Sequence, residues 1–143
     1  MMSKIFFFFY WFFDNLSILS VVKLLKRNPE KDQIIASAFW FMGLTSYVTI
    51  YLIETFSTKK YNKVQKSREL SPSKFAIKIK SEKTDSLLNV IKYSFDLLPA
   101  GKDSLIWEKL FKIRLPEELA GLGGLSSAII ASYQAYISWF LFL

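Results

Sequence analysis

The residue types that carry most enzyme chemistry are scarce in this sequence. Its 143 residues include no cysteine and no histidine. Disulfide frameworks, zinc sites with Cys or His ligands, Cys nucleophiles and Ser-His-Asp triads are therefore excluded. Carboxylates remain as candidates for acid–base or metal chemistry, in the pairs Asp96 and Asp103 or Glu117 and Glu118. No neighbouring group orients either pair, so we expect no catalytic residue, no metal site and no cofactor.

A glycine-rich segment near the C-terminus, Gly121-Leu-Gly123-Gly124, invites comparison with a nucleotide-binding loop. A dinucleotide-binding fingerprint would need a further glycine where Ser126 stands, and a strand before it. Small residues instead recur at every fourth position, which predicts a groove for close helix packing or self-association. The groove has two rows, which are Gly123, Ser127, Ala131 and Ala135, and then Ala120, Gly124, Ala128 and Ser132.

Two long apolar stretches predict the elements that would carry this groove. Residues 34–53 contain no charge and no proline, and at 1.5 Å per residue they span roughly 30 Å, the thickness of a bilayer core. Residues 119–143 also lack charge, and Gln134 is their only strongly polar side chain. Two buried helices in a soluble core are the alternative. The rest of this 52% hydrophobic chain offers too little polar surface to cover them.

A third apolar stretch, residues 5–22, begins with the sequence IFFFFYWFF and then meets Asp14 and Asn15. In a single span Asp14 would lie near the centre, where a carboxylate costs roughly 2.5 to 3.5 kcal/mol. Nine apolar or aromatic residues offset that cost, so the balance is close. A signal peptide is the competing interpretation, and the missing small-x-small cleavage site weakens it. We expect residues 5–22 to associate with the membrane, and whether they span it stays open.

The net charge of +7 is concentrated in one segment. Residues 59–83 contain nine basic and two acidic side chains, which predicts a flexible basic loop over 57–84. Nucleic-acid binding would require interleaved aromatic residues, and only Tyr61 and Phe75 are present. We therefore expect contact with anionic lipid headgroups and no nucleic-acid partner.

Two amphipathic helices are predicted within residues 85–115. In the first, an apolar stripe of about 100° predicts either a membrane face or a face packed against the spans. Its residues are Leu87, Leu88, Ile91, Phe95 and Leu98. The opposite, polar side consists of Asp85, Asn89, Lys92 and Asp96.

Proline and glycine at 99–101 are expected to end this first helix. The second helix, 105–115, has Trp107 close to Lys109, as in a helix at the membrane interface, although packing against the spans explains it equally well. Pro116 is expected to begin the last helix.

Several of these segments resemble the peroxin-11 family of peroxisomal membrane-proliferation proteins, in the family's order. They are Phe13-Asp-Asn-Leu-Ser17, Ala38-Phe-Trp-Phe-Met-Gly-Leu44, Ile91-Lys-Tyr-Ser-Phe-Asp-Leu-Leu-Pro-Ala100 and Leu119-Ala-Gly-Leu-Gly-Gly-Leu-Ser-Ser-Ala128, followed by Ser132-Tyr-Gln134. The resemblance covers residues 13–56 and 85–137 and leaves out the basic loop. Family members usually carry a longer N-terminal part with an amphipathic helix, and a Phe-rich segment stands there in this chain.

The resemblance implies one all-α membrane domain over residues 1–143, a multi-pass protein of the peroxisomal membrane and not an enzyme. It would promote peroxisome elongation, division and number control by inserting into the bilayer and associating with itself. The implied partners are membrane lipids, further copies of the chain, and the peroxisomal import and fission machinery.

A pore or carrier for small metabolites is the alternative function. Neither long apolar stretch contains an ionisable residue, which counts against a transport path. An unrelated two-span protein of the secretory pathway is a third interpretation. Topology also stays open. The positive-inside rule places the basic loop in the cytosol, whereas the family arrangement places it in the matrix with both ends cytosolic.

Overall fold

The computed structural model describes residues 2–56 and 72–140 of the chain. This part is all-α, as predicted, and contains no strand. Its helices are α1 (Met2–Val21), α2 (Pro29–Phe56), α4 (Pro72–Asp103), α5 (Ile106–Phe111) and α6 (Glu117–Phe140).

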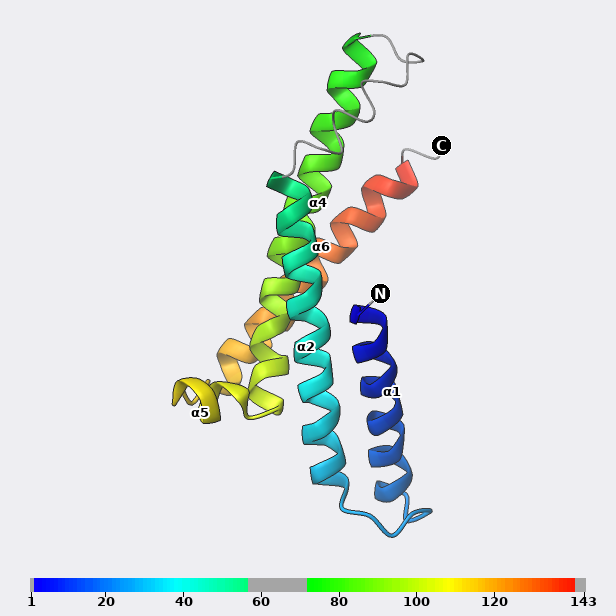
Figure 1. Ribbon diagram of the computed structural model, residues 1–143, viewed down its shortest axis with the longest axis vertical. Coiled ribbons are helices and arrows are strands. Elements are labelled where there is room, and N and C mark those ends of the chain that lie inside the picture. The colour runs from blue at the N-terminus through cyan, green and yellow to red at the C-terminus, as the bar shows by residue number, and fades with distance from the viewer. Residues whose placement is uncertain (1, 57–71, 141–143) are drawn as a thin grey trace.

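The four long helices run alternately down and up the molecule, so that consecutive ones are antiparallel (Figure 1). α2 packs against both α1 and α4, and α6 packs against α4. The short helix α5 lies at the corner where the chain turns from α4 into α6 (Figure 1). The arrangement is therefore two helical hairpins, α1–α2 and α4–α6, joined through the contact between α2 and α4.

The start of α2 is well determined by its sequence. The Asn28 side-chain oxygen accepts hydrogen bonds from the backbone N–H groups of Glu30 at 3.0 Å and Lys31 at 3.3 Å, and Pro29 occupies the first helical position. Asp32 in the first turn pairs with Arg27 in two hydrogen bonds, of 2.9 Å from Nε and 2.7 Å from Nη2. This forked pair fixes the turn between α1 and α2.

α1 and α2 are held together by aromatic rings. Phe9 and Phe13 of α1 both stack on Phe39 of α2, with ring centroids 5.1 and 5.8 Å apart, and Tyr10 stacks on Trp40 at 5.8 Å. These distances lie in the range in which rings attract one another. The interface is therefore made of large apolar surfaces.

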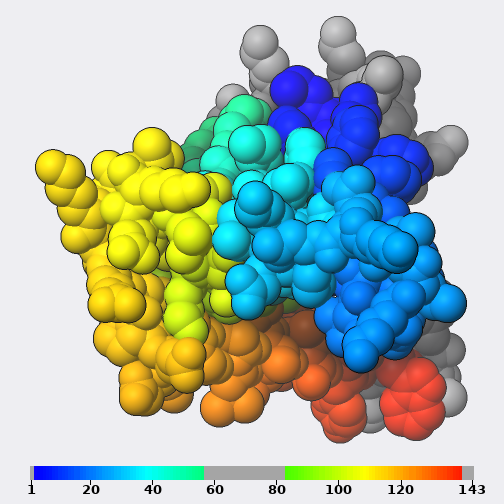
Figure 2. All heavy atoms as spheres, turned by 90° about the horizontal axis from the view of Figure 1, so that it is seen from below, coloured from blue at the N-terminus to red at the C-terminus, as the bar shows by residue number. Residues whose placement is uncertain are grey.

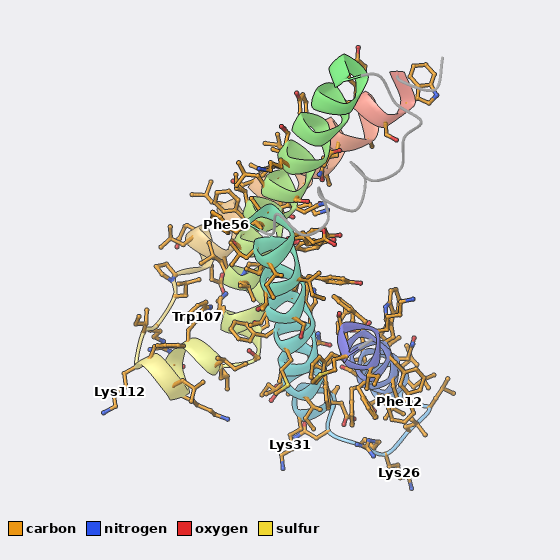
Figure 3. All side chains as sticks on the ribbon, turned by 45° about the horizontal axis from the view of Figure 1, so that its top comes forward. Phe12, Lys26, Lys31, Phe56, Trp107 and Lys112 are labelled. Atoms are coloured by element: carbon orange, nitrogen blue, oxygen red, sulfur yellow. The ribbon has the colours of Figure 1, made fainter. Side chains whose placement is uncertain are left out.

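Two described helices, α1 and α2, are long and apolar enough to cross a membrane. Only 11% of the apolar window of α1 and 22% of that of α2 are buried inside the chain. The core helix of a soluble protein would be mostly buried, whereas here large side chains such as Phe8 and Trp11 are more than half exposed. Phe12 points away from α2 (Figure 3). This pattern fits lipid-facing helices.

Only one of the two candidate spans matches a predicted one. α2 contains the predicted span 34–53, whereas the second candidate is α1, the segment whose spanning the sequence leaves open. The other predicted span, 119–143, is helical as α6 up to Phe140 but is not one of the two candidates among the described residues. Its glycine, serine and glutamine residues lower its hydropathy.

Three predicted boundaries differ from the structure. The basic loop expected over 57–84 is already helical from Pro72, and residues 57–71 lie outside the described part. Pro99 does not end α4, which continues to Asp103, because a proline inside a helix can kink it without ending it. The helix predicted over 105–115 is shorter, Ile106–Phe111. α6 does begin directly after Pro116, as predicted.

Candidate functional site: the α4–α6 helix pair

Polar side chains link α4 to α6 at regular intervals. The Gln134 amide nitrogen donates to the Asn89 side-chain oxygen at 3.1 Å. Seven residues away on each helix, Ser127 lies beside Asp96, where its hydroxyl favours the charged form of the carboxyl and lowers its pKa. Because seven residues are about two helical turns, these pairs lie on one line along each helix. They fix the register in which the two antiparallel helices meet.

An ion pair lies at the end of the α4–α6 interface, or seam, that is next to α5. Lys102 near the end of α4 lies 3.1 Å from Glu117 in the first turn of α6. The Glu117 side chain is 88% exposed, so the pair contributes little to stability. The sequence offered two carboxylate pairs for chemistry. One member of each pair, Asp96 and Glu117, lies instead at the contact between α4 and α6. Among residues 2–56 and 72–140 no cluster of three acidic side chains that could hold a metal is found.

Small residues of α6 fill the seam between these polar links. Ala120 and Ser127 are 7% and 6% exposed, and Gly123 is buried with them. A Cβ atom added to Gly123 would lie 2.7 Å from the Phe95 carbonyl oxygen and 3.0 Å from Leu98 Cδ1. The two helices therefore approach each other closely, and glycine is required at this position.

Pro99 provides a reason for this close approach. In a continuous helix the N–H of residue 99 would donate to the carbonyl of Phe95, but proline has no N–H. The Phe95 carbonyl, without that donor, lies on the side of α4 that Gly123 approaches. The proline expected to end the helix instead marks the point where α6 packs most closely.

Trp107 of α5 fastens the corner. Its indole nitrogen donates to the carbonyl oxygens of Leu97 and Leu98, both at 3.3 Å, and its ring meets Phe41 of α2 edge to face at 5.7 Å. A Cβ atom on Gly101 would overlap the indole ring. Figure 3 shows Trp107 on the side of α5 that faces α2 and α4. The sequence places Trp107 in the predicted helix 105–115 but gives no sign of its contact with Gly101.

The polar side of α4 faces the interior of the chain. Burial raises the pKa of the Asp96 carboxyl, and the hydrogen bond from Ser127 and the charge of Lys92 oppose that shift only in part. Burial also lowers the pKa of Lys92, whose ammonium lies 4.4 Å from the centre of the Tyr93 ring. Tyr93 stacks on Tyr47 and Tyr51 of α2, and burial raises its pKa to about 12.

The apolar side of α4 faces outward. Leu87, Ile91 and Phe95 are 49%, 38% and 36% exposed, while Leu88 and Leu98 are partly covered. Three of the five residues predicted to form a membrane face are thus available to lipid. A helix on a soluble protein normally turns its apolar stripe inward. The orientation of α4 is the reverse and suits an apolar environment.

The seven small residues predicted to pack or self-associate fall into two sets. Ala120, Gly123 and Ser127 form the covered row, which faces α4. The others form the open row, where Ala128, Ala131 and Ser132 are exposed, Gly124 is partly exposed, and no atom lies within 4 Å of a Cβ added to Gly124. Within the chain, the helix that packs on the covered row is α4.

The chain is similar to a known protein family along most of its length. The model of the family described as Peroxisomal biogenesis factor 11 (PEX11) matches residues 1–136. The match starts at the Phe-rich segment and runs through the basic segment, so it is continuous and broader than the two ranges of the resemblance. No curated protein and no solved structure matches the chain.

Proposed function

The chain belongs to the Peroxisomal biogenesis factor 11 family, and from this premise we propose that it promotes the elongation and division of peroxisomes and controls their number. The family membership itself implies a peroxisomal membrane protein involved in peroxisome proliferation, and the family is described as a biogenesis factor rather than as an enzyme. The observation that carries the proposal is the match over residues 1–136.

In the proposed mechanism α1 and α2 anchor the protein, and α4 acts on one leaflet. Leu87, Ile91 and Phe95 are exposed along one side of α4, and two polar side chains of that helix, Asn89 and Asp96, lie against α6. An apolar face of this kind inserts among headgroups and adds area to one leaflet. Unequal leaflet areas bend a membrane, and bending is what elongation requires.

Self-association would concentrate this effect. We place α6 in the membrane as a further span, which makes the protein multi-pass, with its open row at the interface between copies. Lipid tails are as apolar as leucine, so membrane helices associate through close backbone approach at small residues. Gly124, Ala128 and Ser132 leave such a surface uncovered. The proposed partners are membrane lipids, further copies of the chain, and the peroxisomal import and fission machinery.

A pore or carrier for small metabolites is the second candidate function. The observation that favours it is the position of Lys92 and Asp96, two ionisable groups half-buried on the inner side of α4. Ionisable groups inside a membrane protein often mark a transport path. Against it, the Asp96 carboxyl lies beside Ser127 of α6, between two packed helices. Division therefore remains the first candidate.

The proposal is tested by counting and measuring peroxisomes in cells. Excess protein should lengthen or multiply them, and its loss should leave fewer and larger ones. The variant Leu87→Asp with Ile91→Asp should blunt the effect of excess protein without changing localisation, because it places two charges on the exposed apolar face. The matched control swaps the same two residues, Leu87→Ile with Ile91→Leu, and should act like the unmodified chain. Unchanged organelle number after both overexpression and deletion would contradict the division role and favour the pore.

A further inference from the structure

An open groove lies between the beginning of α2 and the corner helix α5. Its volume is about 420 Å³. Ile35, Ala38 and Met42 of α2 form one wall, and Ile106 and Leu110 of α5 form the opposite wall. Seen end-on, the residues of α5 and those of the first half of α2 lie next to each other on this face of the molecule (Figure 2). The volume is within the range of about 300 to 1,000 Å³ that small-molecule sites occupy.

The groove combines apolar walls with a single positive charge. Of the residues that line it, Lys109 alone is charged, and the Ser104 hydroxyl is buried and donates to the Gly101 carbonyl. An apolar chain attached to an anionic group matches this combination, and membrane phospholipids with a net negative headgroup have that chemistry. We propose that the groove binds one acyl chain of an anionic phospholipid, with the lipid phosphate at Lys109.

The direction of the groove agrees with the direction of a lipid in the bilayer. The first turn of α2 carries Glu30, Lys31 and Asp32, whereas from Ile34 onward the helix is uncharged for twenty residues. The groove wall extends from Ile34 to Met42. This is about 12 Å at 1.5 Å per residue. The groove therefore starts at the polar end of a candidate span and continues into its apolar part, as a headgroup and its chain do.

α5 has the composition and the fixed position that this role requires. Trp107 and Lys109 on a short helix are typical of the membrane interface. Two residues with left-handed backbone, Leu105 at φ 59° and Lys112 at φ 55°, bracket the helix, and Trp107 fastens it to α4. Non-glycine residues in this conformation persist only where the surrounding structure imposes it. The wall that carries Lys109 is therefore held in place against α2.

The size of the groove favours a lipid chain over a helix from a second copy. A volume of 420 Å³ spread over about 12 Å of helix gives a cross-section of about 35 Å². A helix about 10 Å across, side chains included, needs roughly 80 Å². A helix would have to push α5 away from α2, whereas an extended chain need not.

The experiment uses the full chain reconstituted into phosphatidylcholine bilayers that contain a phosphatidic acid with a photoactivatable acyl chain. After illumination, mass spectrometry locates the labelled residues. We expect the label on residues 34–42 and on α5, with much less label when the same photoactivatable chain is attached to phosphatidylcholine. The proposal rests on α2 crossing the membrane, as proposed above, and not on the division role. Flotation of the protein with the vesicles checks separately that the chain is held in the bilayer.

Matched variants test the two halves of the site. We expect two tryptophan variants to remove most of the labelling, Ala38→Trp in the α2 wall and Leu110→Trp on α5. Leu110 is 73% exposed, so its replacement fills the groove without disturbing a buried residue. Lys109→Glu should abolish the preference for phosphatidic acid. Lys112→Glu makes the same charge change at a residue that points away from α2 (Figure 3) and should keep the preference.

Two results would overturn the proposal. The first is label spread evenly over the exposed faces of α1 and α2 and unchanged by both tryptophan variants, which would mean bulk lipid only. The second is a cross-link between α5 of one copy and α2 of another copy. If both tryptophan variants abolish that cross-link, the groove is a contact between copies.

Discussion

The two helical hairpins are built on opposite principles. α1 and α2 meet through large aromatic rings, such as Phe9 on Phe39 at 5.1 Å and Tyr10 on Trp40 at 5.8 Å. α4 and α6 meet through small residues and polar links, with Gly123 against the Phe95 carbonyl and Gln134 bonded to Asn89. Rings attract over a range of positions, whereas a glycine contact and a hydrogen bond each require one register.

This difference shows where the fold is specific. Apolar burial gives membrane helices little reason to pair, because lipid tails are equally apolar. The α1–α2 hairpin relies on dispersion between rings and on a short turn, and it should tolerate exchange of one ring for another. The α4–α6 hairpin relies on close approach and satisfied polar groups, and it should be sensitive to single atoms. The following substitutions probe that contrast.

The largest effect is expected at Gly123. Gly123→Leu must separate α4 from α6, because even a Cβ atom would lie 2.7 Å from the Phe95 carbonyl oxygen. Overpacking of this kind costs typically about 1 to 3 kcal/mol. Unfolding of the monomer in detergent, followed by circular dichroism, measures the loss. Gly124→Leu, one residue away with no atom within 4 Å, is the control and should unfold like the unmodified protein. Equal losses would show that α6 does not pack on α4 through Gly123.

On the α1–α2 side the comparable change should be mild. Phe13→Leu removes one ring stacked on Phe39, while Phe9 keeps its own contact with the same ring. Because Phe13 is only partly covered, we expect a loss of about 1 kcal/mol, in the range for one aromatic pair. The same detergent unfolding measurement applies. A loss as large as that of Gly123→Leu would remove the proposed contrast between the hairpins.

At the corner, Gly101→Ala should displace Trp107. The added methyl group occupies the position of the indole ring, which then loses its hydrogen bonds to Leu97 and Leu98. In a chain with the other three tryptophans changed to phenylalanine, emission from Trp107 should move to longer wavelength and become easier to quench. Gly121→Ala, at an unobstructed glycine, should leave the spectrum unchanged. Unchanged emission from the Gly101 variant would mean that the indole is not held at that glycine.

A smaller effect, dependent on pH, is expected at Asp96. Its pKa is raised in the folded chain above the ordinary value of 3.8, so the folded state prefers the protonated form. Stability is then highest at acidic pH and falls as the pH rises from that ordinary value through the folded pKa. Asp96→Asn should therefore resist unfolding better than the unmodified chain at neutral pH, and the advantage should vanish in acid. An advantage that persists at low pH would contradict this origin.

The smallest effect is expected for the amide pair of the seam. In a double-mutant cycle of Asn89→Leu and Gln134→Leu, each single change leaves one amide without its partner. Hydrogen bonds between membrane helices measured in this way average about 0.6 kcal/mol. We expect a coupling free energy of that order from unfolding in detergent. Strict additivity of the two changes would show that the bond at 3.1 Å contributes nothing to stability.

Much of the helical framework follows from local sequence. Asn28 and Pro29 begin α2, Pro116 precedes α6, and the uncharged residues 34–53 lie inside a helix that can cross a membrane. These features depend on residues that are neighbours in the chain. The identity of the second candidate span was harder to predict, since the cost of Asp14 in α1 nearly balances the apolar residues around it.

The arrangement of the site depends on contacts distant in sequence and was only half predictable. The apolar stripe of α4 could be read from the sequence and stays a prediction as a membrane face, but nothing in the sequence indicated that Asn89 and Asp96 on the opposite side would contact α6. The four-residue spacing in α6 predicted a packing groove without showing which row α4 would cover. Pro99 carried a misleading signal, because its effect on the helix depends on what packs against the freed carbonyl of Phe95.

The small residues of α6 are proposed to divide into a covered row that builds the monomer and an open row that joins copies. The chain has no cysteine, so single cysteines can be introduced directly and oxidised in the membrane. Ala128→Cys lies in the exposed open row, and the adjacent Ser127→Cys lies in the covered row at 6% exposure. We expect disulfide-linked dimers from Ala128→Cys and almost none from Ser127→Cys. Equal cross-linking at both positions, or none at Ala128→Cys, would contradict this division.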